Sequence, residues 1–245
     1  PSTSDVTVKI TILSTGQEIT YTDLRNNNPK VYQLTIDNPN QEQALNGVLF
    51  VDKDSTGNNT LSSGLVIEAD CPVYASIRYN AGAQAGALVS KGDASLGTHF
   101  RTGMMTNGNQ NEENQAQNTT NSHNLNFISV MATQDNTLVR FDLPNASSNL
   151  RIANYSYNGN PIVKTLNRNE SMIIATDARE ANNDGENRFA LIGALVRSVD
   201  DSGSVIVEDP TKPIVVNVGS ASGTFMSTEG CLLYTSPSPR DRSSS

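Results

Sequence analysis

Asp52, Asp54 and Asn58 form the clearest metal-binding pattern in the 245-residue chain. They belong to one polar segment in which oxygen-bearing side chains alternate around Gly57. Calcium takes roughly six to eight oxygen ligands and accepts a flexible loop, so these three side chains could supply part of a coordination shell. The bidentate glutamate of an EF-hand is missing, because Ser63 holds its position. The segment is therefore a candidate calcium loop, and a solvated turn is the simpler interpretation.

Carboxylates form a second pattern that could do chemistry. A glycosidase needs two suitably placed carboxylates, one acting as general acid and the other as base or nucleophile. No spacing in the sequence selects a pair, so glycoside hydrolysis is kept as an alternative hypothesis. Its candidate residues are Asp52, Glu68, Asp142 and Glu208.

The histidines and cysteines predict neither a zinc site nor a disulfide framework. His99 and His123 have no second ligand at a zinc-binding spacing, and we interpret His99 as a hydrogen-bonded structural side chain. The two cysteines, Cys71 and Cys231, are far apart and belong to no C-x-x-C motif. Cys71 precedes Pro72 in an apolar run, which predicts a small buried thiol. Apart from calcium, the sequence predicts no cofactor.

The composition is that of short strands and hydrogen-bonded turns. Hydrophobic residues make up 36% of the chain and charged residues only 17%. Asn, Thr, Ser and Gly, which favour turns and strands over long helices, dominate the remainder. The net charge is −8 and the basic residues are isolated, which disfavours a nucleic-acid partner. The sequence contains no apolar run of about 18 residues, so it predicts no membrane-spanning helix.

Turn residues divide the chain into short apolar runs, which predict an all-β fold of small antiparallel sheets. The segment 106–124 contains almost no hydrophobic residue and is predicted to be a surface loop. The predicted strands are 6–13, 18–22, 31–36, 48–51, 65–69, 73–79, 127–133, 137–141, 150–155, 162–166, 171–175, 189–196, 204–208 and 214–218.

The segment FISVMATQDNTLVRF, residues 127–141, has the strongest strand pattern. Its two β-forming runs flank residues 134–136, where Asp and Asn tolerate the left-handed backbone of a tight turn. The pattern predicts a β-hairpin whose two strands pair directly with each other. The first strand is apolar on nearly both faces, which predicts an interior position.

Two stretches of the chain resemble each other. Residues 64–77 and 203–218 share the order glycine, apolar run, aspartate, proline and second apolar run. The predicted copies cover residues 6–82 and 137–223. Such an internal repeat of small sheets predicts a propeller-like arrangement, with a pair of β-sandwiches as the alternative.

The C-terminal segment 231–245 differs from the remainder of the chain. Its sequence, CLLYTSPSPRDRSSS, shows no strand alternation and ends in a serine run. It is similar to the translated read-through of a sequencing adapter. We expect a non-native or disordered tail, so residues 1–230 are predicted to be an incomplete all-β domain.

Three motifs occur in order along the chain. They are SKGDASLGTHF at 90–100, FISVMATQDNTLVRF at 127–141 and DPTKPIVVNVGSASGTF at 209–225. Together they resemble the N-terminal domain of the IgGFc-binding protein family, which occurs in large bacterial surface and secreted proteins and in a mucus-associated animal protein. The resemblance covers roughly residues 60–230, and the chain departs from it in the insertion at 106–124.

This resemblance implies a non-catalytic binding or adhesion module, here a fragment of a bacterial cell-surface or secreted protein. The implied partners are glycoproteins, glycans or other surface proteins. They would be contacted through loops, since loops vary freely on a rigid sheet scaffold. Neither nucleic acid nor direct membrane insertion is expected. The alternative remains a glycosidase-type enzyme that uses paired carboxylates.

Overall fold

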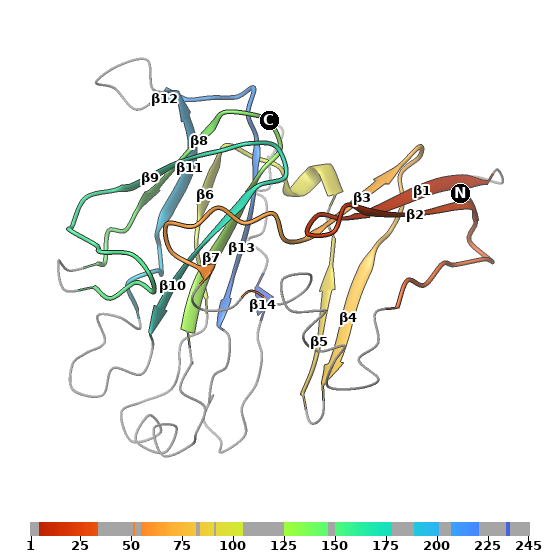
Figure 1. The fold of residues 1–245 in the computed structure, drawn as a ribbon, viewed down its shortest axis with the longest axis horizontal. Coiled ribbons are helices and arrows are strands. Elements are labelled where there is room, and N and C mark those ends of the chain that lie inside the picture. Colours follow the sequence, from red (N-terminus) through yellow and green to blue (C-terminus); the bar gives the residue numbers. More distant parts are fainter. Residues whose placement is uncertain are drawn as a thin grey trace, which may run out of the picture. The chain divides into compact units, whose positions relative to one another are not determined.

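In a computed structural model of the protein, the described residues are almost entirely β-strands and connections (Figure 1). This confirms the predicted all-β class. The chain divides into two compact units: Pro1–Asp52 with Leu61–Ala75 form unit 1, and Lys53–Thr60 with Ser76–Ser245 form unit 2. The structure describes residues 5–33, 51, 55–81, 84–90, 92–104, 125–146, 150–177, 189–200, 207–220 and 234–235.

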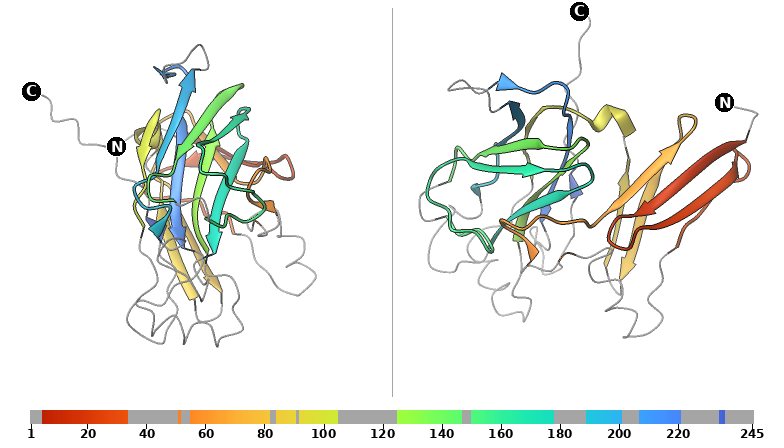
Figure 2. Two further views of the ribbon diagram at one scale, coloured as in Figure 1. Left: turned by 90° about the vertical axis from the view of Figure 1, so that its left-hand side faces the viewer. Right: turned by 45° about the horizontal axis from the view of Figure 1, so that its top comes forward.

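Unit 1 contains a three-stranded antiparallel sheet with the order β2-β1-β3. Its strands are β1 (Val6–Ile12), β2 (Gln17–Leu24) and β3 (Leu65–Ala69). Figure 2 shows β1 and β2, in red, as a hairpin. Gly16 has a φ of 69°, which a residue without a side chain adopts at low cost, and its N–H donates to Ile12 O at 2.8 Å.

Unit 2 contains two larger antiparallel sheets and a separate hairpin. The first sheet has the order β10-β7-β13-β14, and in the second β9, β8 and β11 are consecutive. β6 and β12 pair with successive segments of β11 on the side away from β8. The hairpin is formed by β4 and β5. Their bounds are β4 (Ser76–Ala81), β5 (Gln84–Val89), β6 (His99–Arg101), β7 (Leu125–Ala132), β8 (Thr137–Asp142), β9 (Ile162–Leu166), β10 (Ser171–Asp177), β11 (Leu195–Asp200), β12 (Val207–Glu208), β13 (Ile214–Ser220) and β14 (Tyr234–Thr235), and a short 3-10 helix, η2 (Gly92–Ser95), precedes β6.

A single hydrophobic core lies between the two larger sheets. It takes Ile128 and Val130 from the first sheet and Val139, Phe141 and Val196 from the second, all fully buried. Because one core is supplied by alternate residues of both sheets, the sheets pack face to face as a β-sandwich. Each sheet therefore keeps one outer face, and the outer face of the second sheet carries the charged side chains described below.

The segment 127–141 is not a hairpin, and its predicted direct strand pairing was wrong. β7 pairs with β10 and β13, whereas β8 pairs with β9 and β11 in the opposite sheet (Figure 1, both strands in green). The apolar face of β7 and that of β8 meet across the core, which a hairpin within one sheet would not allow. The connection 133–136 is therefore an arch between sheets, and the predicted interior position of β7 is confirmed.

A second connection stacks against this arch and satisfies its backbone. The residues between β9 and β10 also cross from one sheet to the other. Arg168 N–H donates to Asp135 Oδ1 at 3.0 Å, and Asn169 N–H donates to Ala132 O at 2.9 Å. Asn136 has a φ of 55°, in the left-handed region that asparagine tolerates. The predicted turn residues are thus present, but they join two sheets.

Several other predicted strands have different bounds. Residues 150–155 form a turn in which Ile152 bridges Tyr155 and Thr176. Of the run 189–196, only the last two residues belong to β11. Residues 31–33 form no strand, and the predicted strand 48–51 lies outside the described residues apart from Val51. The short strand β6 and the strand β5 were not predicted.

Cys71 is exposed, which corrects the predicted buried thiol. The strand predicted at 73–79 begins only at Ser76, so Cys71 lies in the bend after β3 and outside the strands. Near the other end of the chain, Tyr234 and Thr235 pair with β13. The internal repeat, the propeller-like arrangement and the nature of the tail stay predictions. Within the described ranges, no helix is long and apolar enough to cross a membrane.

Candidate functional site

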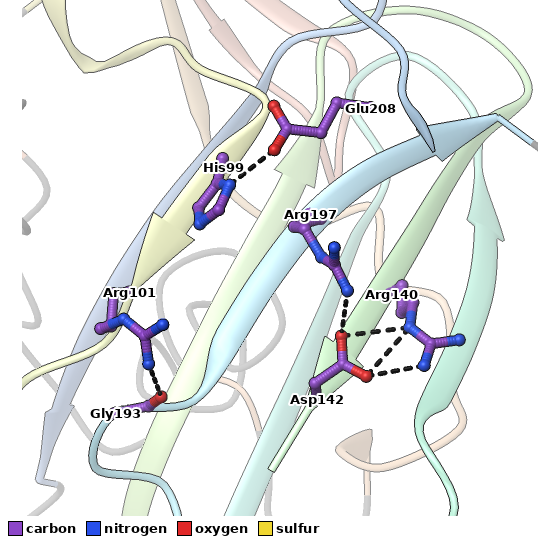
Figure 3. Close-up of polar contacts among 7 residues, drawn as sticks. All are labelled: His99, Arg101, Arg140, Asp142, Gly193, Arg197 and Glu208. Atoms are coloured by element: carbon purple, nitrogen blue, oxygen red, sulfur yellow. Dashed lines mark hydrogen bonds and ion pairs between the residues drawn. The ribbon is translucent and has the colours of Figure 1, made fainter. Parts of the chain in front are cut away.

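The outer face of the β9-β8-β11-β6 sheet gathers six ionisable side chains. The alternation along β8 explains why: Val139 and Phe141 point into the core, so Arg140 and Asp142 point outward. The pairing register then places Arg197 of β11 opposite Arg140. We call this surface the charged face, defined by His99, Arg101, Arg140, Asp142, Arg197 and Glu208 (Figure 3).

Asp142 binds two arginines at the centre of the charged face. Arg140 donates from Nε at 3.0 Å and from Nη2 at 2.7 Å, and Arg197 donates from Nη2 at 2.7 Å (Figure 3). The three side chains are only 22%, 26% and 16% exposed for Arg140, Asp142 and Arg197. Like charges directly opposite each other destabilise a sheet. Asp142 therefore holds together two cations that would otherwise repel.

The pKa of Asp142 is set by two opposed effects. Burial alone would raise it, but the hydrogen bonds and charges of Arg140 and Arg197 outweigh burial and hold the pKa below the usual 3.8. Asp142 is therefore ionised at neutral pH. Two guanidinium groups share this one carboxylate, so the cluster keeps an excess positive charge.

Glu208 and His99 form a second pair on the same face. His99 Nδ1 lies 2.6 Å from Glu208 Oε1, and Thr98 Oγ1 donates to Glu208 Oε2 at 2.9 Å. The hydrogen bond from His99 lowers the pKa of Glu208 below its usual 4.5, with Thr98 acting in the same direction. The predicted hydrogen bonding of His99 is confirmed, and its structural role stays a prediction. His123 lies outside the described residues.

Arg101 lies on the charged face without a carboxylate partner in the described part of the chain. Its Nη1 donates to Gly193 O at 3.0 Å, which is a neutral acceptor. In the pairing register Arg101 is opposite Leu195, and His99 is opposite Arg197. Arg101 and Arg197 are therefore diagonal neighbours on adjacent strands, with Cα atoms about 7–8 Å apart.

The structure describes only one of the three residues predicted to bind calcium. Asp52 and Asp54 lie outside the described residues, and Asn58 is exposed. The backbone around Asn58 is held by the sandwich, because Lys164 Nζ donates to Asn58 O at 2.8 Å and Gly57 N–H donates to Ile173 O at 2.8 Å. Among the described residues, no group of three or more His, Cys, Asp or Glu side chains could hold a metal ion.

The carboxylates considered for glycoside hydrolysis are engaged elsewhere. Glu68 belongs to unit 1 and pairs with Lys9 at 3.0 Å. Asp142 and Glu208 lie on one sheet, but each is held by its own cationic or hydrogen-bonding partners. Asp52 is outside the described residues. The structure thus brings Asp142 and Glu208 onto one face and shows neither in the raised-pKa state of a general acid.

The arginines of the charged face were missed by the sequence analysis. One signal was available: Arg140 and Asp142 alternate with the buried residues of β8, so their outward direction follows from the sequence alone. The positions of Arg101 and Arg197 beside them depend on the pairing of β6 and β8 with β11. That pairing joins segments far apart in the chain and leaves no local pattern.

The fold and this face define an antiparallel β-sandwich with an exposed charged sheet surface. The sequence profile of the family described as IgGFc binding protein matches residues 85–239, which include both sheets of the sandwich. The match spans more than half of the chain, so the chain belongs to the IgGFc-binding family, as its three motifs predicted. This is a family of binding proteins that are typically extracellular or secreted. No curated protein and no solved structure matches the chain significantly.

Proposed function

We propose that this chain is a non-catalytic extracellular binding module whose partner is a glycoprotein, with the Fc region of immunoglobulin G as the first partner to test. The observation that carries the proposal is the family match over residues 85–239. The rigid sandwich supplies a scaffold on which exposed surfaces can bind a partner without rearrangement. Cell-surface or secreted localisation belongs to the same proposal.

The ionisation of the carboxylates supports a non-catalytic role. A glycosidase general acid must stay protonated near neutral pH, which requires a raised pKa. Hydrogen bonds lower the pKa of both Asp142 and Glu208. Removing Asp142 from its arginines would also break the cluster that stabilises the outer face. The glycosidase hypothesis is thus less well supported than binding.

Binding can be tested with the full chain immobilised on a biosensor. Fc is titrated over it, with Fab as the control for other parts of the antibody. We expect saturable binding of Fc with a Kd in the micromolar range or below, and none of Fab. A titration with enzymatically deglycosylated Fc then shows whether the Fc glycan contributes to binding. An absence of saturable binding to Fc, to mucin glycoproteins and to a glycan array would contradict the proposal.

Two parts of the sequence prediction remain proposals within this function. Loops are expected to contribute contacts to the partner, and the segment 106–124 lies outside the described residues. Calcium ligation by Asp52, Asp54 and Asn58 is tested by melting the chain with and without calcium. A functional site would give a rise in Tm with calcium that Asp54→Ala abolishes. An unchanged Tm would support the interpretation of the segment as a solvated turn.

A further inference from the structure

The net charge of the charged face is opposite in sign to that of the whole chain. The chain carries a net charge of −8, yet the face presents Arg101, Arg140 and Arg197 against only two carboxylates. Asp142 is shared by two of these arginines, and the hydrogen bond of Arg101 goes to the neutral Gly193 O. Counted over these three arginines and two carboxylates, the face has an excess of one positive charge on an otherwise acidic chain, and this excess favours an acidic partner.

The arginines are held in place but keep unused donors. Arg197 donates from Nη2 to Asp142, and its Nε, which has no hydrogen-bond partner among the described residues, is buried. Arg101 donates from Nη1 alone within the same part of the chain. A guanidinium group offers about five N–H donors in a fixed fork that matches a carboxylate. The exposed Arg101 thus retains donors for a second acceptor, whereas the largely buried Arg197 contributes mainly its positive charge.

Apolar side chains lie between these cations. Leu195 is half-buried and faces Arg101 on one neighbouring strand and Asp142 on the other. Val163, opposite Arg140 on β9, is 47% exposed. Arginines beside exposed apolar side chains are typical of surfaces that bind proteins.

We propose that the charged face is the docking surface for a protein partner that presents carboxylates, and that Arg101 contacts them while the neighbouring Arg197 adds positive charge. The inference rests on the proposed binding function and names the chemistry of the partner's contact. A sulfated polysaccharide fits less well, because it calls for a denser run of unpaired cations, and here Asp142 and Glu208 already offset part of the charge. A second copy of this chain, which is acidic, is a distinct outcome of the test.

The test compares two charge reversals in the full chain. Arg101→Glu changes the charged face, and Arg78→Glu makes the same charge change at an exposed position of β4. Arg101→Gln serves as a milder variant if the reversal impairs folding, which circular dichroism and Tm report. Each protein is titrated with Fc, with a fluorescent ten-residue oligoglutamate, with oligolysine and with heparin, at low and at moderate salt.

We expect Arg101→Glu to weaken oligoglutamate and Fc binding at least tenfold, and Arg78→Glu to change either by less than twofold. Oligoglutamate binding should weaken as salt rises, whereas any oligolysine binding to the acidic remainder of the chain should not weaken in Arg101→Glu. Equal affinities for the wild type and both Arg101 variants would overturn the docking surface while leaving Fc binding intact. Oligoglutamate binding that depends on Arg101 without any Fc binding would support the surface and reject Fc as the partner. If heparin binds through Arg101 and oligoglutamate does not bind, the partner is a sulfated glycan instead of a protein. If the chain self-associates and Arg101→Glu abolishes this, the partner is a second copy.

Discussion

Gly57 lies directly against the backbone of Asn154. A Cβ atom added to Gly57 would be 2.6 Å from Asn154 O and would also clash with Ala153 O. The segment containing Gly57 covers the outer edge of β10, since Gly57 N–H donates to Ile173 O at 2.8 Å. The turn at 150–155 covers the next part of that edge, where Ala153 N–H donates to Ala175 O at 2.9 Å. Glycine is therefore required where two segments close one edge of the sandwich.

We expect Gly57→Ala to lower the free energy of unfolding by about 3 kcal/mol or more, through backbone strain and the clash together. Gly159→Ala is the matched control. Gly159 also has a positive φ, 84°, but nothing lies within 4 Å of an added Cβ. The control should therefore show the conformational cost alone, about 1 kcal/mol. Urea denaturation of the full chain measures both, and equal losses would show that the edge can move aside.

The arch between β7 and β8 makes a prediction at Asn136. This residue has a φ of 55°, and its carbonyl accepts a hydrogen bond from Lys212 Nζ at 2.8 Å. Asn136→Val should lower the free energy of unfolding by about 1–2 kcal/mol, because a β-branched residue is strained in the left-handed region. Asn136→Gly should be nearly neutral. Thermal denaturation compares the two, and a valine variant as stable as the glycine variant would be inconsistent with this arch geometry.

Removing the carboxylate of Asp142 should destabilise the second sheet. Asp142→Asn leaves Arg140 and Arg197 opposite each other without the anion between them. We expect a loss of about 2 kcal/mol, since none of the three side chains is more than 26% exposed. Adding Arg140→Gln should recover part of this loss by removing the repulsion. Urea denaturation measures the free energy of unfolding of the single and double variants. A double variant that loses as much as the two single variants together would argue against repulsion.

The same aspartate makes stability depend on pH. The folded-state pKa of Asp142 lies below the usual 3.8, so the unfolded chain binds the proton more readily than the folded chain. The stabilisation is complete above the unfolded pKa, about 4, and is lost as the pH falls through the lower folded value. Between pH 6 and pH 3 the wild type should therefore lose more stability than Asp142→Asn. Urea denaturation of both proteins at several pH values across this range measures the difference. Equal slopes of the free energy of unfolding against pH would contradict the assignment.

The sequence predicts strands well where the signal is local. β3 and β9 have their predicted bounds, because turn residues delimit each run, and in β9 the first and last residues are also buried. The pairing of the strands was not predictable in the same way. The turn residues Asp135 and Asn136 suit a hairpin and an arch equally well, and the choice depends on contacts with the β9–β10 connection.

The candidate site shows the same limit. The outward direction of Arg140 and Asp142 follows from their alternation with Val139 and Phe141. The position of Arg101 does not, because β6 is only three residues long and its place beside β11 is fixed by pairing. The carboxylates Asp142 and Glu208 were identified from the sequence as candidates for catalysis, and their partners support a role in holding a surface together.

Side-chain footprinting with hydroxyl radicals, applied to the full chain with and without Fc, tests the central claim most directly. If the chain is a binding module that uses the charged face, oxidation of Val163, Leu195 and His99 should fall several-fold when Fc is bound. Exposed Tyr74 in unit 1 serves as the internal reference and should react at an unchanged rate. Oxidation of Val163, Leu195 and His99 that is the same with and without saturating Fc would contradict the claim.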